Sequence, residues 1–129
     1  MVWITALILV VIAAVHLLWA VGYWFPIRDE RALARAVVGA PGIERMPGAV
    51  ATSFVVLALM IIVLALFWAP GWPRTIVLTG AALVMFARGI ASYVPMFQRM
   101  SPEEPFATLD RRYYGPLCLA LGVGVALSI

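Results

Sequence analysis

The chain has 129 residues, of which 65% are hydrophobic and only 12% charged, against about 25% charged in a typical soluble domain. A soluble fold of this size cannot bury that much apolar surface, so we expect an integral membrane protein in contact with the lipid bilayer. All nine basic residues are Arg, no nucleic-acid partner is expected, and the single cysteine and single histidine exclude an internal disulfide and a multi-histidine metal site.

Four stretches have the roughly 20 mainly apolar residues needed to cross the hydrocarbon core. They predict spans over about 3–25, 47–69, 75–97 and 110–129. Aromatic residues near the span ends, such as Trp24, Trp72 and Tyr113, are typical of the membrane interface. We therefore expect one all-α membrane domain, 1–129, folded as an up-and-down bundle of four transmembrane helices.

The two longer connections should contain short interfacial helices. After span one, Asp29 can cap a helix that Gly39 would end. After span three, Ser101, Pro102 and Glu104 match a capping box for about one turn. Seven of the nine arginines lie in these two connections, so the positive-inside rule places them in the cytoplasm and both termini on the other side.

A few polar groups lie inside the predicted spans, where such groups usually face protein or a water-filled cavity. His16 and Arg88 each lie nine residues from the cytoplasmic end of a span, at a depth of roughly 14 Å, and Cys118 at roughly 12 Å. Helical spacing places a second polar residue on the same face of each of three spans. These residues are Tyr23 with His16, Ser92 with Arg88 and Tyr114 with Asp110, and each set forms a polar stripe. These stripes predict a cavity that opens to the cytoplasm.

Two prolines should disturb the helices at this depth. Pro95 leaves the carbonyl of Ala91 without its usual helical partner, and Gly115-Pro116 should free the carbonyl of Arg112. Irregular backbone inside a membrane is tolerated where it lines a cavity or packs against protein.

Each polar residue also has a purely structural interpretation. His16 can bond a neighbouring helix, and Arg88 can extend toward the cytoplasm and form an ion pair with Asp110. Cys118 can be a small packing residue, and the glycines of span four can allow close helix contact. The functional alternative is that Arg88 binds the anionic group of a lipid, quinone-like or carboxylate ligand.

Several segments resemble one bacterial family of small membrane proteins. They are His16-Leu17-Leu18-Trp19-Ala20 with Gly22, Arg45-Met46-Pro47-Gly48, Arg88-Gly89-Ile90 and FATLDRRYYGPLCL from Phe106 to Leu119. The family is domain-of-unknown-function family 3995, and the resemblance covers most of the chain. It implies a four-span protein of the bacterial cytoplasmic (inner) membrane without an established activity. It also implies that the family pattern includes His16, Arg88, Asp110, Tyr114, Pro116 and Cys118.

Two functions follow as hypotheses. The first is a binding module, with enzymatic activity left open, whose pocket contains His16, Trp19, Tyr23, Arg88, Ser92, Asp110, Tyr114 and Cys118. The catalytic candidates are His16 as general acid or base, Arg88 as anion holder, and Asp110. The second is a structural or accessory subunit of a larger membrane complex, or a homo-oligomer. A small transporter formed by a dimer is a third possibility.

No cofactor is clearly implied by the sequence. A haem could take His16 and either Met60 or Met85 as its axial ligands. No other metal is expected, because one cysteine and one histidine cannot form a cysteine-rich zinc site or a multi-histidine site.

Overall fold

The computed structural model describes residues 1–129 and contains helices but no strands. The elements are α1 (Val2–Ala20), α2 (Glu30–Val37), α3 (Ala49–Phe67), α4 (Trp72–Ala91), α5 (Pro95–Met100), α6 (Phe106–Leu109), the π-helix η1 (Asp110–Tyr114) and α7 (Gly115–Ala126). η1 joins α6 to α7, so residues 106–126 form one helical run. α1, α3 and α4 are each long and apolar enough to cross a membrane. The chain is thus an all-helical membrane protein, as its composition predicts.

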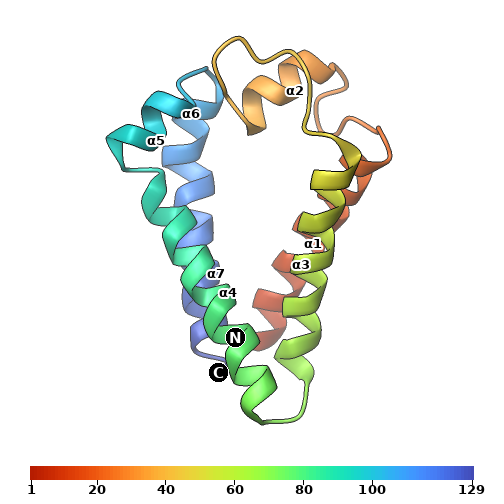
Figure 1. Ribbon diagram of the computed structural model, residues 1–129, viewed down its shortest axis with the longest axis vertical. Helices are drawn as coiled ribbons and strands as arrows, with labels where there is room; N and C mark the ends of the chain where they lie inside the picture. Colours follow the sequence, from red (N-terminus) through yellow and green to blue (C-terminus); the bar gives the residue numbers. More distant parts are fainter.

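The long helices run alternately up and down, but they pack as two pairs rather than as an even bundle. α1 packs along α3, and α4 packs along α7. The two pairs meet at the end that holds both termini and the turn from α3 to α4, which we call the narrow end (Figure 1). They diverge toward the opposite end, the α2 end, where α2, α5 and α6 lie.

The narrow end contains the main hydrophobic core. Its buried residues come from all four long helices: Ala6, Leu9, Ala13, Leu59, Ile62, Ala65, Leu66, Leu78, Ala81, Ala82, Leu121 and Val125. Gly124 of α7 lies against Thr5 of α1, where a Cβ atom would overlap the threonine hydroxyl. The small residue thus allows the two pairs to touch, as expected for glycines in span four.

Arg74 also joins the helices at the narrow end. Its Nε donates to the carbonyl of Ala65 in α3 at 3.0 Å, and its Nη2 donates to the carbonyl of Ser128. Carbonyl groups at helix C-termini carry partial negative charge, which a guanidinium group stabilises. Arg74 therefore links the end of α3 and the chain beyond α7 to the first turn of α4.

A second, smaller core lies beneath α2. It consists of Leu33, Ala34 and Met46, against which Trp19 and Trp24 pack. Asp29 caps α2 by accepting the N–H of Ala32 at 3.3 Å, and Gly39 follows the helix with φ 68°. The prediction of a capped helix here is confirmed, and Leu33 of this helix is fully buried.

The predicted capping box in the second connection is wrong. No helix begins at Ser101, and α6 starts only at Phe106. Glu104 instead accepts hydrogen bonds from the N–H and the hydroxyl of Thr108, at 3.2 and 2.9 Å. Its carboxylate therefore bonds a backbone N–H group in the first turn of α6.

α1 is shorter than predicted because a glycine ends it early. Gly22 adopts the left-handed conformation, with φ 83°, and the N–H of Tyr23 then donates to the carbonyl of Leu18 at 2.8 Å. This pattern is a Schellman C-cap. α1 therefore ends at Ala20 rather than near residue 25.

α4 also stops before the predicted end of its span. It ends at Ala91, and α5 begins separately at Pro95. The carbonyl of Ala91, which we expected to be free, accepts the N–H of Val94 at 3.1 Å. His16 and Arg88 consequently lie only about 6 and 5 Å from the ends of their helices, not roughly 14 Å.

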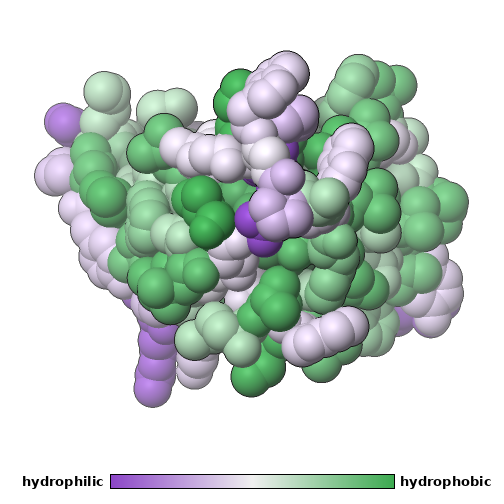
Figure 2. All heavy atoms as spheres, turned by 90° about the horizontal axis from the view of Figure 1, so that it is seen from below, coloured by the Kyte–Doolittle hydropathy of each residue, from purple (hydrophilic) through white to green (hydrophobic).

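Hydrophobic side chains cover the outside of the long helices. Seen from the narrow end, most of the molecule's surface is hydrophobic, with few strongly hydrophilic residues (Figure 2). Trp3, Phe54 and Leu83 are examples, with exposed fractions of 74%, 67% and 64%. A continuous apolar surface of this kind suits contact with lipid and not with water.

Candidate functional site

Arg88 of α4 and Asp110 of η1 form an ion pair at the α2 end. The Nη2 of Arg88 lies 2.6 Å from the Oδ1 of Asp110, and the side chains are 34% and 4% exposed. The Nη1 of Arg88 donates to the hydroxyl of Ser92 at 3.1 Å. The ion pair that the sequence offered as the structural alternative for Arg88 is therefore present, and Ser92 is part of it.

The π-helix positions Asp110 for this contact. Pro116 has no N–H to donate to the carbonyl of Arg112, so a regular α-helix cannot continue through this point. The wider turn forms just before it, and the N–H of Gly115 donates to the carbonyl of Asp110. The irregular backbone predicted at Gly115-Pro116 is thus observed as η1.

Gly115 also lets α7 approach α4 closely. A Cβ atom at this position would lie 2.7 Å from the Oγ of Ser92 and 3.0 Å from the carbonyl oxygen of Asp110. Only glycine leaves enough room here. The same close contact therefore brings Asp110 within reach of Arg88.

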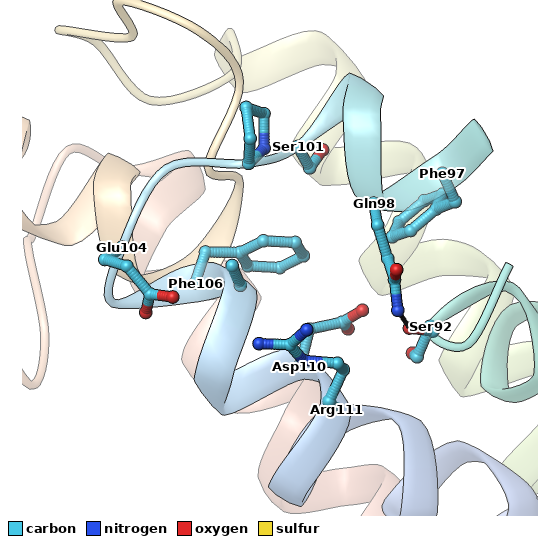
Figure 3. A pocket seen from close by; sticks show the side chains of 10 residues that line it. Ser92, Phe97, Gln98, Ser101, Glu104, Phe106, Asp110 and Arg111 are labelled. Atoms are coloured by element: carbon cyan, nitrogen blue, oxygen red, sulfur yellow. Dashed lines mark hydrogen bonds between the residues drawn. The ribbon is translucent and has the colours of Figure 1, made fainter. Parts of the chain in front are cut away.

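A polar pocket of about 250 Å³ lies beside the ion pair (Figure 3). Its lining residues are Ser92, Phe97, Gln98, Ser101, Pro102, Glu104, Phe106, Ala107, Asp110 and Arg111. In Figure 3, Phe97 and Gln98 reach it from α5, opposite Phe106 and Asp110. The Nε2 of Gln98 donates to the backbone carbonyl of Ser92 at 3.1 Å, which holds α5 against the end of α4.

The spare hydrogen-bonding capacity around this pocket comes largely from arginine. A guanidinium group has five N–H donors, and Arg88 uses two of them on Ser92 and Asp110. Arg111 bonds through its backbone carbonyl, which accepts from the hydroxyl of Tyr93 at 2.9 Å, and not through its guanidinium. Both acidic groups of the pocket already accept hydrogen bonds, Asp110 from Arg88 and Glu104 from Thr108.

An apolar groove adjoins the polar pocket along α4 and α5. It has a volume of about 460 Å³ and is lined by Ala87, Ile90, Ala91, Val94, Met96, Phe97 and Met100. Phe97 lines the groove and the pocket alike, and the guanidinium of Arg88 lies 4.9 Å from the centre of its ring. A polar space and an apolar space therefore meet at one side chain.

His16 does not join this site, so the expected meeting of His16, Arg88 and Asp110 is wrong. It lies in the other helix pair, with Nδ1 2.8 Å from the carbonyl oxygen of Ile12 and its ring 4.7 Å from that of Trp19. It lines a separate hollow of about 200 Å³ below the end of α2, together with Trp19, Val37, Val38, Met46, Pro47, Ala51, Thr52 and Val55. We call this the His16 hollow. The polar face of one helix does not determine which other helix it will contact.

The remaining candidates are dispersed. The hydroxyl of Tyr23 accepts from Arg28 at 2.7 Å in an exposed loop, and the hydroxyl of Tyr114 donates to the carbonyl of Ala36 in α2 at 3.0 Å. Cys118 is a half-buried free thiol. None of these three candidates lines the polar pocket or the His16 hollow.

No arrangement of metal or haem ligands accompanies these residues. No three His, Cys, Asp or Glu side chains gather as a metal site would require. Met60 and Met85, the suggested partners of His16 for haem, do not line the His16 hollow. Met85 packs instead against the main core.

Sequence reasoning missed Phe97, Gln98 and Arg111 as pocket residues. Phe97 was assigned to the end of span three, on the assumption that α4 continued through Pro95. A proline that starts a new helix just after α4 was the available signal, since it redirects the chain and returns Gln98 to Ser92.

Comparison with known proteins identifies a family for this chain. The family model described as "Protein of unknown function (DUF3995)" matches residues 9–125, which include the polar pocket and the His16 hollow. No match was found among curated proteins or among solved structures. Since the family match covers most of the chain, the protein belongs to the DUF3995 family, the family that its sequence motifs resemble.

Proposed function

We propose that the protein binds an anionic amphiphile, such as an acidic phospholipid, at the α2 end. The observation that carries this proposal is the shared side chain of Phe97, where the polar pocket meets the apolar groove. An amphiphile has the same two parts. Its acidic head group suits the pocket, and its acyl chain suits the groove.

In this proposal the protein crosses the bacterial cytoplasmic membrane four times. The fourth span is the helical run 106–126, which pairs with α4. The α2 end faces the cytoplasm, because seven of the nine arginines lie in residues 26–46 and 98–112 at this end. The pocket would then open near the inner leaflet, at the level of the head groups.

The charge of the ligand follows from the arginines. Arg88 lies beside the pocket rather than among its lining residues, and it already neutralises Asp110. In this proposal a bound anion bonds the guanidinium of Arg111 in the pocket and reaches the three remaining donors of Arg88 at its edge. Hydrogen bonds between a guanidinium and a phosphate or carboxylate are roughly twice as strong as neutral ones. An acidic head group is thus preferred over a zwitterionic one, because the carboxylates of Glu104 and Asp110 already accept hydrogen bonds within the protein.

Binding, rather than catalysis, is the function this arrangement supports. Asp110 is paired with Arg88, and the proposed general acid or base, His16, lines a different hollow. The pocket itself contains two serine hydroxyls, of which Ser92 accepts from Arg88 and makes no direct hydrogen bond to a carboxylate or to His16. No activated nucleophile is therefore present.

Native mass spectrometry of the purified chain tests the proposal. The protein would be given phosphatidylglycerol or phosphatidylcholine with identical acyl chains, and the bound lipids counted. The test variant is Arg88→Gln with Asp110→Asn, which neutralises the pair but keeps its shape. The matched control is Arg99→Gln, which removes one arginine from α5 outside the residues that line the pocket.

We expect one tightly held phosphatidylglycerol on the wild-type protein and on Arg99→Gln. The double variant should lose about tenfold or more in affinity for it, which corresponds to one charge-assisted contact of about 1.5 kcal/mol. Equal binding of the two lipids to all three proteins would overturn the proposal. Stable co-purification of another membrane protein in place of lipid would favour the accessory-subunit hypothesis.

A further inference from the structure

We infer that the His16 hollow is a second binding site, and that it takes the hydroxyl head of an apolar molecule. The hollow shares no residue with the polar pocket beside Arg88. Its ligand chemistry is therefore independent of the proposed binding of an anionic lipid.

The tautomer of His16 follows from its contact with Ile12. A carbonyl oxygen only accepts hydrogen bonds, so the Nδ1 that lies 2.8 Å from it must carry the proton and donate. In the neutral ring, Nε2 is then left with a lone pair. Nε2 makes no hydrogen bond in the structure, while the ring lines the hollow. The Nε2 atom of His16 is thus a hydrogen-bond acceptor without a donor.

The other polar side chains of the hollow supply no competing donor. The hydroxyl of Thr52 donates to the carbonyl of Gly48 at 3.1 Å, and the indole N–H of Trp19 donates to the carbonyl of Phe25 at 2.7 Å. Thr52 keeps its own oxygen as a second acceptor. A molecule that enters the hollow must therefore bring an O–H or N–H group of its own.

A hydroxyl fits this site better than an ammonium group does. The first turn of α3 has no side-chain cap, so its backbone N–H groups beside Ala51 still need an acceptor. A hydroxyl oxygen can accept one of these while its proton bonds Nε2, whereas an ammonium only donates. The hollow also contains no carboxylate to balance a positive charge.

The rest of the ligand should be apolar and longer than the hollow. Most of the lining of the hollow is apolar and comes from Val37, Val38, Met46, Ala51 and Val55. The volume of about 200 Å³ is below the roughly 300 Å³ at which sites for complete small-molecule ligands begin. It accommodates a head group and its first few carbons, and the remaining chain would lie in the hydrocarbon of the bilayer.

Because His16 is the only histidine in the chain, its ring can be observed alone. Protein labelled with ¹⁵N-histidine, in lipid nanodiscs and mildly alkaline buffer, gives one pair of ring-nitrogen signals. The probe is 1-decanol. The matched probe is methyl decyl ether, which has a similar chain and oxygen but no proton to donate.

We expect decanol to shift the Nε2 signal in a saturable way, to leave Nδ1 protonated, and the ether to have no such effect. Ala51→Leu, which fills the hollow from α3, should weaken the decanol response about tenfold. The same substitution at Ala58, an exposed residue of α3 that lines neither the hollow nor the α4–α5 groove, should leave the response unchanged.

Three results would overturn the inference. They are equal shifts with the alcohol and the ether, an Nε2 that carries the proton in the ligand-free protein, and a decanol response that Ala51→Leu does not weaken. Because Ala51 is exposed, its substitution should not prevent folding. An unfolding temperature of Ala51→Leu equal to that of the wild-type protein would verify this.

Discussion

The narrow end and the α2 end hold the same two helix pairs together by different means. At the narrow end, side chains of all four long helices pack in one core, Gly124 meets Thr5, and Arg74 joins the helix ends. At the α2 end, α2 spans the separation between the pairs (Figure 1). It packs on Trp19 on one side, and on the other it bonds the helical run 106–126 through Tyr114.

Several contacts that join the α2 segment to the second pair are polar. Arg35 forms an ion pair with Glu103 at 3.4 Å, and the N–H of Glu103 donates to the carbonyl of Gly39 at 3.0 Å. Apolar packing fills space, whereas a few directional bonds across a wider separation leave room between the helices. Both the polar pocket and the His16 hollow lie at this end. We therefore propose that the difference separates a structural half from a binding half.

The largest expected effect is the loss of one partner of the buried ion pair. Arg88→Met should destabilise the protein by about 3 kcal/mol, because the carboxylate of Asp110 would stay buried without its counter-charge. Chemical unfolding in detergent, followed by circular dichroism, measures this. Arg88→Gln combined with Asp110→Asn should recover most of the loss. If the double variant were no more stable than Arg88→Met, the pair would not explain the effect.

The next effect concerns the contact between α4 and α7 at the α2 end. Gly115→Ala should cost about 2 kcal/mol, since its Cβ would press on Ser92 and on the rigid backbone of Asp110. Gly80→Ala in α4 is the matched control, because nothing lies within 4 Å of its Cβ position. That change should be neutral or slightly stabilising. Equal unfolding midpoints for the two variants would contradict the close approach of α4 and α7.

The Arg88–Asp110 pair and the π-helix η1 show which features can be predicted from the sequence alone. Helical spacing joined Ser92 to Arg88, charge suggested Asp110 as a partner, and Pro116 predicted the irregular backbone at η1; all three are observed. Each depends on chemistry within one helix or on a single pair of opposite charges. Local rules of this kind can be read from residue types and spacing.

The arrangement of the helices could not be predicted in the same way. His16 was expected near Arg88 because both were assigned the same depth, but depth does not determine which helices pair. The positive φ of Gly22 and the separate helix after Pro95 also shortened α1 and α4. The sequence does not indicate the role of Arg74, because its acceptors lie at distant helix ends.

A smaller effect is expected at the narrow end. Gly124→Ala should destabilise the protein by about 1 kcal/mol, less than Gly115→Ala, because the opposing Thr5 lies near the start of α1, where the helix end can shift. Adding Thr5→Ala should restore stability, giving a clear coupling in a double-mutant cycle. Lipid binding should be unchanged in both variants. A loss of phosphatidylglycerol here would show that the two ends are not independent.

The smallest effect is expected for the contact of α2 with η1. Tyr114→Phe removes one hydrogen bond, to the carbonyl of Ala36, and should cost about 0.5 kcal/mol. Hydrogen exchange should nevertheless accelerate in α2 and not in the core of α3. Tyr113→Phe is the control, because Tyr113 is 55% exposed and its hydroxyl forms no hydrogen bond within the protein. Equal exchange in the two variants would mean that Tyr114 does not hold α2.

The most direct test of the binding half is to map where an acidic lipid lies. Phosphatidylglycerol with a photoreactive group in its acyl chain would be cross-linked to the protein in nanodiscs, and the modified peptides identified. We predict that the cross-links concentrate between Ala87 and Met100, along the groove of α4 and α5, and that they disperse in the variant with Arg88→Gln and Asp110→Asn. Cross-links spread evenly over α1, α3 and α4 in the wild-type protein would contradict a binding site at the α2 end.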